Sequence, residues 1–592
     1  MQFIIGYVTA VRGTSVRAIV HPNLYQTTYI YDGRLYRGVA INEFIVIKKG
    51  VSRYYRKKLR VKKSSKRKNF DNTQPNNEKF DRFVDIKIIG YISGNKFHSG
   101  IKYLPMIQDE LHLISDEIIS TIYSFEGKID AKKILIGKSL LEEIPIHIPI
   151  NGIFNSHIGI FGNTGSGKSN SLAKIYSELF SCVGDKLFNK STFVFIDFNG
   201  EYKPIHNQFK DKSNYIELDT HLKNGNQKLK IKKSEYWDPE LLSVLFSATE
   251  KTQKPFLNIL VRNRLKYGDE LNDYFHDTIK IMFGQNQHRE TISVLRSIIN
   301  IINPEKSKEI NSELSEFSWF SRGENNKYYR NGTFLNTPDE YLAHLPTLAS
   351  TNIDITTLSP FQQITVRATL QLIKSVSRNY VQYEHISPLI SKINSSSSSL
   401  EKVIEIIDDI ELETKPLLFI SLKNCNQETK KSIPMLIAKC SFLEHKKKDT
   451  SQNSFHLIVD EAHNILSEIS NRESETWKDY RLELFEEIIK EGRKFAYFVT
   501  IASQRPADIS TTIISQIHNY FLHRLVNEND LFLLKNSISN LDSSSRGLVP
   551  ILPSGACVVS GTAFHTPMII QIQRLPSELA PESDTIDLDS FW

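Results

Sequence analysis

Cysteine is scarce in this chain: there are four in 592 residues, and none falls in a C-x-x-C pair. The sequence therefore supports neither a disulfide framework nor a zinc site. Long hydrophobic runs are also missing. No stretch approaches the roughly 20 apolar residues that span a bilayer, and the start MQFIIGYVTAVRG lacks the pattern of a signal peptide. These absences predict a cytoplasmic protein with no membrane segment.

Positive charge is concentrated at one place. The formal net charge is +7, but residues 53–68 carry ten Lys or Arg and no acid, and removing those ten cations leaves the remainder at −3. A basic arm that follows nucleic-acid phosphates and a solvated loop both fit this run, and the two readings stay open. With 40% hydrophobic and 24% charged residues, the chain as a whole has the composition of a folded globular protein.

The length and the changing residue pattern predict several domains. Short alternating runs such as FIIGYVTAV, EFIVI and VDIKIIGYI are typical of a small antiparallel barrel. Buried runs such as TFVFIDF, FHLIVD and YFVTIAS, separated by helical patterns, predict an α/β fold with a mostly parallel sheet. The predicted order is a β-barrel domain at 1–140 with the basic insertion 53–68, an α/β core at 141–234 and 401–575, a helical insertion at 235–400 that ends in a flexible serine linker (395–399), and an acidic tail at 576–592.

A phosphate-binding loop opens the α/β region. Residues 162–169 match G-x-x-x-x-G-K-[ST] without a mismatch, after a predicted strand and at the start of a predicted helix. The glycines let backbone N–H groups turn inward around phosphates, and the helix N-terminus adds the positive end of its dipole. Lys168 is expected to reach the β and γ phosphates of ATP, and the Ser169 hydroxyl to ligate Mg²⁺. The residues expected to bind nucleotide are Gly162, Asn163, Thr164, Gly165, Ser166, Gly167, Lys168, Ser169 and Asn170.

Acidic residues follow two of the buried runs. Asp460 comes after FHLIV and is expected at the carboxyl end of a strand beside the loop, where it would hold Mg²⁺; Glu461 is the candidate general base for the attacking water. Asp197 ends TFVFID, and for it and the turn 198–202 assistance with the metal and simple helix capping are both open. His463 completes a DEAH string, and we interpret it as a helix-surface histidine.

Two further polar residues are candidates for the site, although neither would predict a role in catalysis if taken alone. Gln504 ends the run FVTIAS, where an amide could contact the γ-phosphate or the attacking water. Arg493 lies near the end of a charged helical segment, where a cation also complements the helix dipole.

Taken together, these segments resemble the HerA family of hexameric DNA translocases, within the FtsK and HerA group of RecA-like P-loop ATPases. The resemblance extends over most of the chain. It includes HIGIFGNTGSGKSNS, IDFNGEY (196–202), LIVDEAHNIL (457–466), EGRKFAYFVTIASQRPADIS (491–510) and LVPILPSGACVVSG (548–561).

The resemblance implies a homohexamer that encircles double-stranded DNA and uses ATP and Mg²⁺. It makes Arg493 an arginine finger supplied in trans to a neighbouring subunit and Gln504 a sensor of the γ-phosphate, with Arg505 and Arg524 as weaker candidates for the shared site. The N-terminal domain would be a HAS-like barrel on which a partner docks. Family members work beside a nuclease or a sirtuin-like effector, and the absence of a nuclease motif here favours a partner-dependent role in anti-phage defence.

Two other classes of function remain. In the first, the ring is an ATPase scaffold that assembles and regulates an effector without processive movement on DNA. The second is a membrane-linked conjugative coupling ATPase, against which the missing transmembrane segments count.

Overall fold

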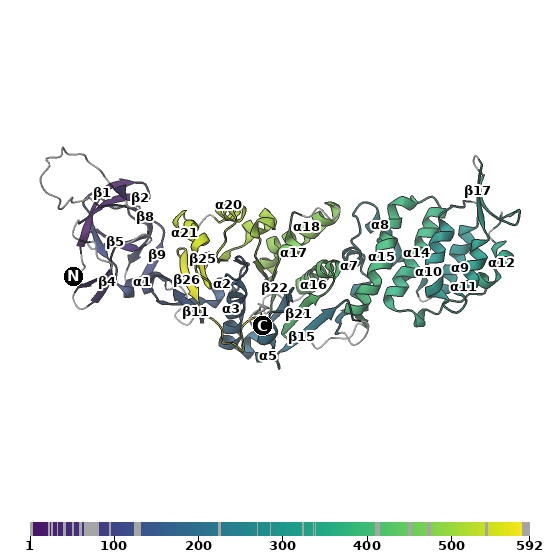
Figure 1. The fold of residues 1–592 in the computed structure, drawn as a ribbon, viewed down its shortest axis with the longest axis horizontal. Coiled ribbons are helices and arrows are strands. Elements are labelled where there is room, and N and C mark those ends of the chain that lie inside the picture. The colour runs from purple at the N-terminus through teal and green to yellow at the C-terminus, as the bar shows by residue number, and fades with distance from the viewer. Residues whose placement is uncertain are drawn as a thin grey trace, which may run out of the picture.

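The computed structural model describes a large part of the chain. The described residues are 4–21, 24, 28–31, 34–39, 43–49, 52–57, 62–63, 82–93, 96–123, 132–222, 227–268, 270–284, 286–322, 325–335, 337, 339–408, 415–447, 453–469, 475–538 and 543–582. The molecule is elongated, with an N-terminal β domain at one end, a helical region at the other and a large α/β sheet between them (Figure 1).

The N-terminal β domain is antiparallel, and its strand pairing runs in a circuit. β1 pairs β2 and β10, β10 pairs β5, β5 pairs β6, β6 pairs β8, and β8 pairs back to β2. Apolar residues of β1, β2, β5, β8 and β10 form a small buried core that includes Ile5, Val16, Ile45 and Val84. The bounds are β1 (Ile4–Arg12), β2 (Ser15–Val20), β3 (Thr28–Tyr31), β4 (Arg34–Arg37), β5 (Phe44–Lys49), β6 (Ser52–Lys57), β7 (Lys62–Lys63), β8 (Arg82–Ser93), β9 (Lys96–Ser99), β10 (Glu110–Leu113) and α1 (Asp116–Tyr123).

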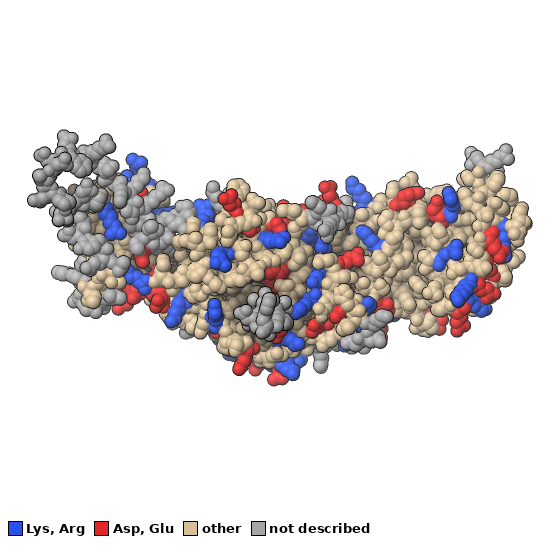
Figure 2. All heavy atoms as spheres, viewed as in Figure 1, with Lys and Arg blue, Asp and Glu red and all other residues tan. Residues whose placement is uncertain are grey.

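The basic run begins within this domain. Residues 53–57 belong to β6 and residues 62–63 to β7, which pairs with β8. The rest of the run lies outside the described residues, so neither reading of it is tested. On the face shown in Figure 2, the described acidic and basic side chains are interspersed rather than gathered by sign.

The large sheet contains the parallel part that the sequence predicts for an α/β fold, together with an antiparallel part that was not predicted. Its order is β12-β11-β26-β25-β24-β13-β23-β22-β14-β21-β15, parallel from β24 to β15 and antiparallel from β12 to β24. The bounds are β11 (Lys133–Ser139), β12 (Pro145–Pro149), β13 (Ile158–Phe161), β14 (Ser191–Asp197), β15 (Ser213–Asp219), β21 (Leu417–Asn424), β22 (Ser454–Val459), β23 (Tyr497–Ser503), β24 (Asn519–Leu522), β25 (Ala556–Gly561) and β26 (Met568–Ile572). β11 pairs β26, so residues 133–139, which the sequence analysis placed in the β-barrel domain, belong to this sheet.

Both faces of the sheet are covered by helices. In β14, Phe193 and Phe195 belong to a core that contains residues of α3, whereas Val194 and Ile196 face a second core that contains residues of α16 and α18. This two-sided burial explains why the strand is apolar at successive positions rather than at every second one. The covering helices include α3 (Lys168–Val183), α5 (Lys203–Gln208), α16 (Gln427–Lys447), α17 (His463–Leu466), α18 (Glu475–Glu491), α19 (Thr511–Gln516), α20 (Glu528–Ser537) and α21 (Ser543–Leu548).

The helical region is built around α14 (Pro360–Ser377), which is buried along nearly its whole length. The helix begins at a capping box formed by Ser359 and Gln362, and it packs against α8, α9, α10 and α15. β16 (Leu229–Lys232) and β20 (Ile404–Ile407) pair in parallel where the chain enters and leaves this region. The other bounds are α7 (Pro239–Leu245), α8 (Gln253–Tyr267), α9 (Leu271–Met282), α10 (Thr291–Ile302), α11 (Ser307–Ser315), α12 (Tyr341–His344), α13 (Pro346–Ala349), α15 (Tyr383–Val403), β17 (Ser318–Arg322), β18 (Asn325–Arg330) and β19 (Thr333–Phe334).

The serine run 395–399 is not a flexible linker, and that prediction was wrong. It lies within α15, where Ser396 and Ser397 are buried and the Ser397 hydroxyl donates to the Ile393 carbonyl at 2.6 Å. Serine has only a modest intrinsic preference against helix, and tertiary packing with an i−4 hydrogen bond overrides it.

Two remaining features concern the membrane and the C-terminus. Among the described residues, no helix is both long and apolar enough to cross a bilayer. Most of the acidic tail, residues 583–592, lies outside the described residues, whereas the backbone N–H of Glu582 donates to the Glu201 carbonyl at 3.0 Å.

Candidate nucleotide site

The phosphate-binding loop connects the carboxyl end of β13 to the amino end of α3. Gly165 and Gly167 have φ angles of +72° and +100°, in the region that favours glycine. A Cβ on Gly167 would lie 2.7 Å from the Gly555 Cα, so this close approach also requires glycine. The loop therefore has the curvature that turns backbone N–H groups inward, as the motif predicted.

The loop is fastened to the segment that follows β24. The Asn163 N–H donates to the Arg524 carbonyl at 2.9 Å, and its side-chain oxygen accepts from the Val526 N–H at 3.2 Å. His523 lies beneath the loop, fully buried, and burial lowers its pKa to about 4. The imidazole is therefore neutral near pH 7 and adds no charge beneath the phosphates' expected position.

A second brace comes from the turn before β25. The Ser554 hydroxyl donates to the Gly165 carbonyl at 3.0 Å, and the Gly555 N–H donates to the Ser166 carbonyl at 2.8 Å. These bonds direct the two carbonyls outward, which leaves the inner side of the loop to N–H groups. No local signal in the sequence predicts this contact.

Lys168, Asp460 and Glu461 form one buried charge cluster. The Lys168 ammonium lies 3.3 Å from Asp460 Oδ1 and 2.5 Å from Glu461 Oε1, and its side chain is only 6% exposed. Burial alone would lower the pKa of Lys168, but the charges of Asp460 and Glu461 outweigh burial and raise it. The predicted convergence of these residues is therefore what the fold produces, at the carboxyl edge of the parallel strands.

Glu461 is held in an uncommon backbone conformation. Its φ is +43°, a region that non-glycine residues rarely adopt and that often marks functional positions. Burial raises the pKa of Glu461, but His463 and then Lys168 lower it to a net value of about 2. The His463 Nδ1 lies 3.3 Å from Glu461 Oε2, with its side chain 15% exposed, so our interpretation of a helix-surface histidine was wrong.

Asp460 is positioned by Tyr202. The Tyr202 hydroxyl donates to Asp460 Oδ2 at 2.8 Å, and both residues are 1% exposed. Asp460 Oδ1 also accepts from the Glu461 N–H at 2.8 Å, so both carboxylate oxygens have fixed directions. Sequence reasoning had no signal for the tyrosine contact beyond the presence of IDFNGEY.

Asp197 organises the turn that carries Tyr202. Its Oδ1 accepts from the Gly200 N–H at 2.7 Å and its Oδ2 from the Tyr202 N–H at 3.0 Å, which favours the capping interpretation. Burial, together with the charge of Asp460, raises the pKa of Asp197 to about 7 against these hydrogen bonds. Glu201, in the same turn, interacts with Ser169, and burial and the nearby Asp460 raise its pKa.

Gln504 reaches the loop, as the sequence suggested. Its Oε1 accepts from the Thr164 hydroxyl at 2.7 Å. Arg505, next in the chain, is exposed and instead lines an adjoining cavity of about 850 Å³ with Asp508 and Asp530. Arg524 touches the loop through its backbone, as described above.

Arg493 lies elsewhere. Arg493 follows α18 and precedes β23, whereas Gln504 follows β23. The two residues therefore lie at opposite ends of the same strand. Its guanidinium is exposed and lies 3.4 Å from the His518 Nε2. A seven-residue strand is about 23 Å long, which is too far for Arg493 to reach the loop of its own chain.

Asn170 is the residue of the expected nucleotide set that the structure assigns differently. Its side-chain amide donates to the Gln573 carbonyl at 3.3 Å and accepts from the Leu575 N–H at 3.1 Å. Both ends of the amide therefore anchor the segment after β26 to α3. The expected contact of Asn170 with nucleotide stays a prediction.

The donor set fits a magnesium nucleotide better than a protein-held metal. Within the described part of the chain, no group of three or more His, Cys, Asp or Glu side chains could hold an ion. Mg²⁺ is commonly held by one or two carboxylates, hydroxyls and phosphate oxygens, and Ser169 and Asp460 are such donors beside the loop. In that arrangement the remaining ligands would come from the phosphates of a bound nucleotide.

Several known proteins are similar to this chain. Residues 134–439 match the family model described as "Helicase HerA, central domain". The chain is 22% identical to the DNA double-strand break repair helicase HerA of Sulfolobus acidocaldarius, over 80% of this chain and 75% of that protein. It is also 22% identical to the protein of the same name from Pyrococcus furiosus, over 82% and 76%. Among solved structures, VirB4 of Thermoanaerobacter pseudethanolicus is 13% identical and covers 77% of this chain and 100% of that chain, with a TM-score of 0.41.

Proposed function

The chain belongs to the HerA helicase family, and from that premise we propose that it hydrolyses ATP with Mg²⁺ to move along double-stranded DNA. The observation that carries the proposal is the buried cluster in which Lys168, the lysine of a complete phosphate-binding loop, contacts both Asp460 and Glu461. Lys168 and the loop N–H groups would hold the phosphates, and Ser169 and Asp460 the metal, which neutralises phosphate charge.

Glu461 is the proposed general base, and its contact with Lys168 suggests how it is controlled. His463 and the Lys168 ammonium, which holds one Glu461 oxygen, together keep the pKa of Glu461 at about 2, which makes the carboxylate a weak base. A Lys168 engaged with phosphate oxygens cannot hold Glu461 as closely. The pKa of Glu461 would then rise, and its carboxylate would accept a proton from water more readily.

We propose that Gln504 transmits the state of the γ-phosphate. Its hydrogen bond to Thr164 places the amide against the loop, and it stands at the end of β23, whose other end leads to Arg493. One strand thus joins the sensor of one site to the arginine proposed to act at the next.

We propose a homohexameric ring in which Arg493 completes the site of a neighbouring subunit. Its exposure and its place at the opposite edge of the sheet support action in trans, and such fingers contribute about 10³- to 10⁵-fold in rate. Mixing two inactive variants tests this arrangement. Lys168→Ala retains the arginine, and Arg493→Ala retains the loop.

Mixed rings should recover ATP hydrolysis at interfaces that pair an intact loop with an intact arginine. The two proteins are denatured together, refolded and assayed against each variant refolded alone. Arg493→Ala rings that turn over at the wild-type rate, or mixtures that recover nothing although rings form, would remove the trans finger.

The N-terminal domain is proposed to be a HAS-like barrel that docks an effector, either a nuclease or a sirtuin-like enzyme, in anti-phage defence. The closed circuit of strand pairing supports the barrel. Beside it, residues 101–107 expose large apolar side chains, including Ile101 (46%), Met106 (60%) and Ile107 (64%), which is typical of a protein-binding surface.

The alternative is an ATPase scaffold that regulates its effector without moving on DNA. Displacement of streptavidin from biotinylated duplex DNA separates the two functions, because only a translocating ring removes it in an ATP-dependent manner. Loss of displacement in Lys168→Ala is the control, and ATP hydrolysis by the wild type without displacement would favour the scaffold.

A further inference from the structure

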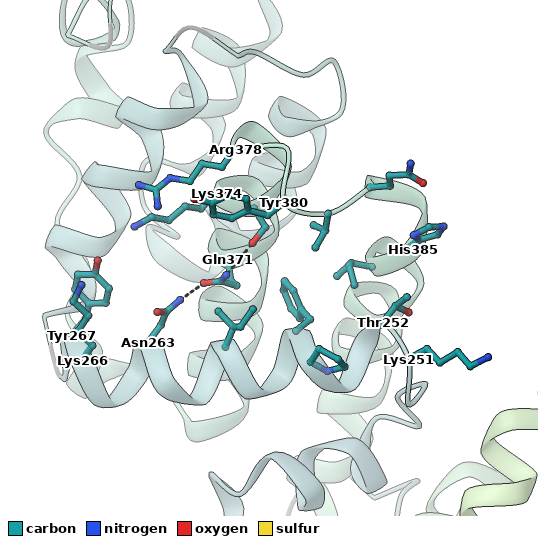
Figure 3. Close-up of a pocket in the computed structure, with 17 residues that line it drawn as sticks. Lys251, Thr252, Asn263, Lys266, Tyr267, Gln371, Lys374, Arg378, Tyr380 and His385 are labelled. Atoms are coloured by element: carbon teal, nitrogen blue, oxygen red, sulfur yellow. Dashed lines mark hydrogen bonds between the residues drawn. The ribbon is translucent and has the colours of Figure 1, made fainter.

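A second polar cavity lies in the helical region, away from the nucleotide site. Its volume is about 700 Å³, and it is enclosed by α8, α14 and the start of α15 (Figure 3). The lining includes Lys251, Lys266, Lys374 and Arg378, and no Asp or Glu is among the described residues that line it. A cavity of this size is typical of a small-molecule site.

Lys374 is the central feature of this cavity. It is only 8% exposed, and the contacts of its ammonium among the described residues are with aromatic rings. Its ammonium lies 4.7 Å from the centre of the Tyr274 ring and 5.4 Å from that of Tyr267. Buried lysines normally have an anionic partner, and two aromatic rings compensate its charge only in part.

The polar groups beneath Lys374 are already satisfied by one another. Gln371 Oε1 accepts from the Tyr274 hydroxyl at 2.7 Å and also from the Asn263 side chain, and the Gln371 amide donates to the Ser375 hydroxyl at 3.0 Å. These groups fix the cavity wall and hold the Tyr274 ring beneath Lys374. The charged donors that the lining offers to a ligand are therefore the Lys and Arg side chains.

The C-termini of two helices balance part of this positive charge. α8 ends at Tyr267 and α14 at Ser377, and each C-terminus is equivalent to about half a negative charge. Three cations, Lys266, Lys374 and Arg378, meet about one negative charge from the two helices. The excess of about two positive charges matches a phosphate monoester, which carries about −1.5 to −2 near pH 7.

The geometry separates the cations into two groups. In Figure 3, Lys374 and Arg378 extend side by side toward Tyr267 and Lys266, whereas Lys251 extends away from them. The ammonium of Lys266 is also 5.3 Å from the centre of the Tyr267 ring, so this ring lies close to two cations. Arg378 is exposed and adds a planar guanidinium, which suits bidentate contact with phosphate oxygens.

We propose that this cavity binds the phosphate group of a nucleotide through Lys374 and Arg378, at a site separate from the phosphate-binding loop. Tyr380, which is 74% exposed at the rim, offers a ring against which a base can stack. The phosphate can come from a free mononucleotide or from the 5′ end of a DNA strand, since both present the same monoester. The proposal does not depend on DNA movement or on ring assembly.

Calorimetric binding to the full chain tests the proposal, with Lys168→Ala as the background so that the phosphate-binding loop contributes less. The probes are AMP against adenosine, and a 5′-phosphorylated single-stranded DNA 12-mer against the same strand with a 5′-hydroxyl. At least one phosphorylated probe should bind about tenfold or more tightly than its unphosphorylated partner. A preference for AMP identifies a free nucleotide, and a preference for the 12-mer alone identifies a strand end.

Variants locate the site. Arg378→Ala and Lys374→Met should each reduce the phosphate preference about tenfold, whereas Lys251→Ala, which removes the same charge from a side chain that points away, should not. Arg378 is exposed, so its variant decides the matter if Lys374→Met does not fold. ATP hydrolysis by Arg378→Ala with an intact Lys168 should equal that of the wild type. The proposal fails if no phosphorylated probe is preferred, or if Lys251→Ala reduces the preference as much as Arg378→Ala does.

Discussion

Tyr202→Phe isolates one hydrogen bond of the nucleotide site. The tyrosine hydroxyl donates to Asp460 Oδ2 at 2.8 Å, with both residues 1% exposed. Burial, followed by the charge of Asp460, raises the pKa of Tyr202 well above its ordinary value. The hydroxyl therefore keeps its proton and donates at any practical pH, and the substitution removes a donor while it retains the ring.

The size of the effect follows from the charge on the acceptor. A hydrogen bond to a charged group contributes about 1.5–3 kcal/mol, and its loss leaves a buried carboxylate oxygen without a donor. If this energy is lost from the transition state, turnover falls about ten- to a hundredfold, at 1.36 kcal/mol per factor of ten. Steady-state ATP hydrolysis at saturating ATP and Mg²⁺ measures the change, and urea unfolding shows whether the fold survives.

Tyr176→Phe is the matched control. The Tyr176 hydroxyl pairs with the Thr500 hydroxyl at 2.6 Å, and the residue is equally buried, between α3 and β23. Its loss should cost about 0.5–1.5 kcal/mol of stability, because both partners are neutral, and leave turnover within about twofold. Equal turnover of the two folded variants would refute the positioning role of Tyr202.

Three other outcomes are expected. Gln504→Ala removes the acceptor of Thr164 and should lower turnover about tenfold or more while ATP affinity changes little; unchanged turnover would exclude a sensor role. Burial lowers the pKa of His456 to about 3, whereas an imidazole in the unfolded chain has a pKa of about 6.5. Because only the unfolded chain takes up this proton as pH falls below about 6.5, the free energy of unfolding should fall by about 2 kcal/mol at pH 5. His456→Phe, with a ring that can still stack on Phe193, should flatten the dependence of unfolding free energy on pH between 7 and 5, and an unchanged slope would contradict this. Asn170→Ala should lower stability by about 1 kcal/mol but leave ATP affinity unchanged, and a tenfold weaker affinity would return Asn170 to the nucleotide site.

The parts of the fold that could be predicted are those whose signal is local. The strands that end at Asp197, Val459 and Ser503 consist of nearly continuous apolar runs, which are typical of a sheet buried on both faces. The bounds of each strand were predicted to within about two residues. The prediction of a flexible linker at 395–399 was wrong because residue composition does not show which parts of the fold pack against a segment. Ser396 and Ser397 are small enough to be buried within a packed helix. β17 to β19, a small sheet within the helical region, has no strong alternation and was not predicted.

The site shows the same division. Lys168, Asp460 and Glu461 could be brought together from sequence, because the carboxyl ends of parallel strands meet at one edge. The Tyr202 contact and the His463 contact could not, since both depend on the direction in which a turn or a short helix leaves a strand. The local sequence shows that such a residue is present, but the direction of its side chain depends on the fold.

The phosphate-binding loop depends on residues almost 400 positions away, and this suggests a route from the nucleotide to the N-terminal domain. Ser554 and Gly555 hold the loop carbonyls, and β25 and β26 follow them directly. β26 pairs β11, the first strand of the large sheet after the N-terminal β domain. A shift of the loop would therefore act on β25 and, through strand pairing, on β26 and β11. Ser554→Ala, which removes a single brace at the loop, should weaken ATP binding about fivefold with little change in unfolding free energy, because the lost bond is exposed.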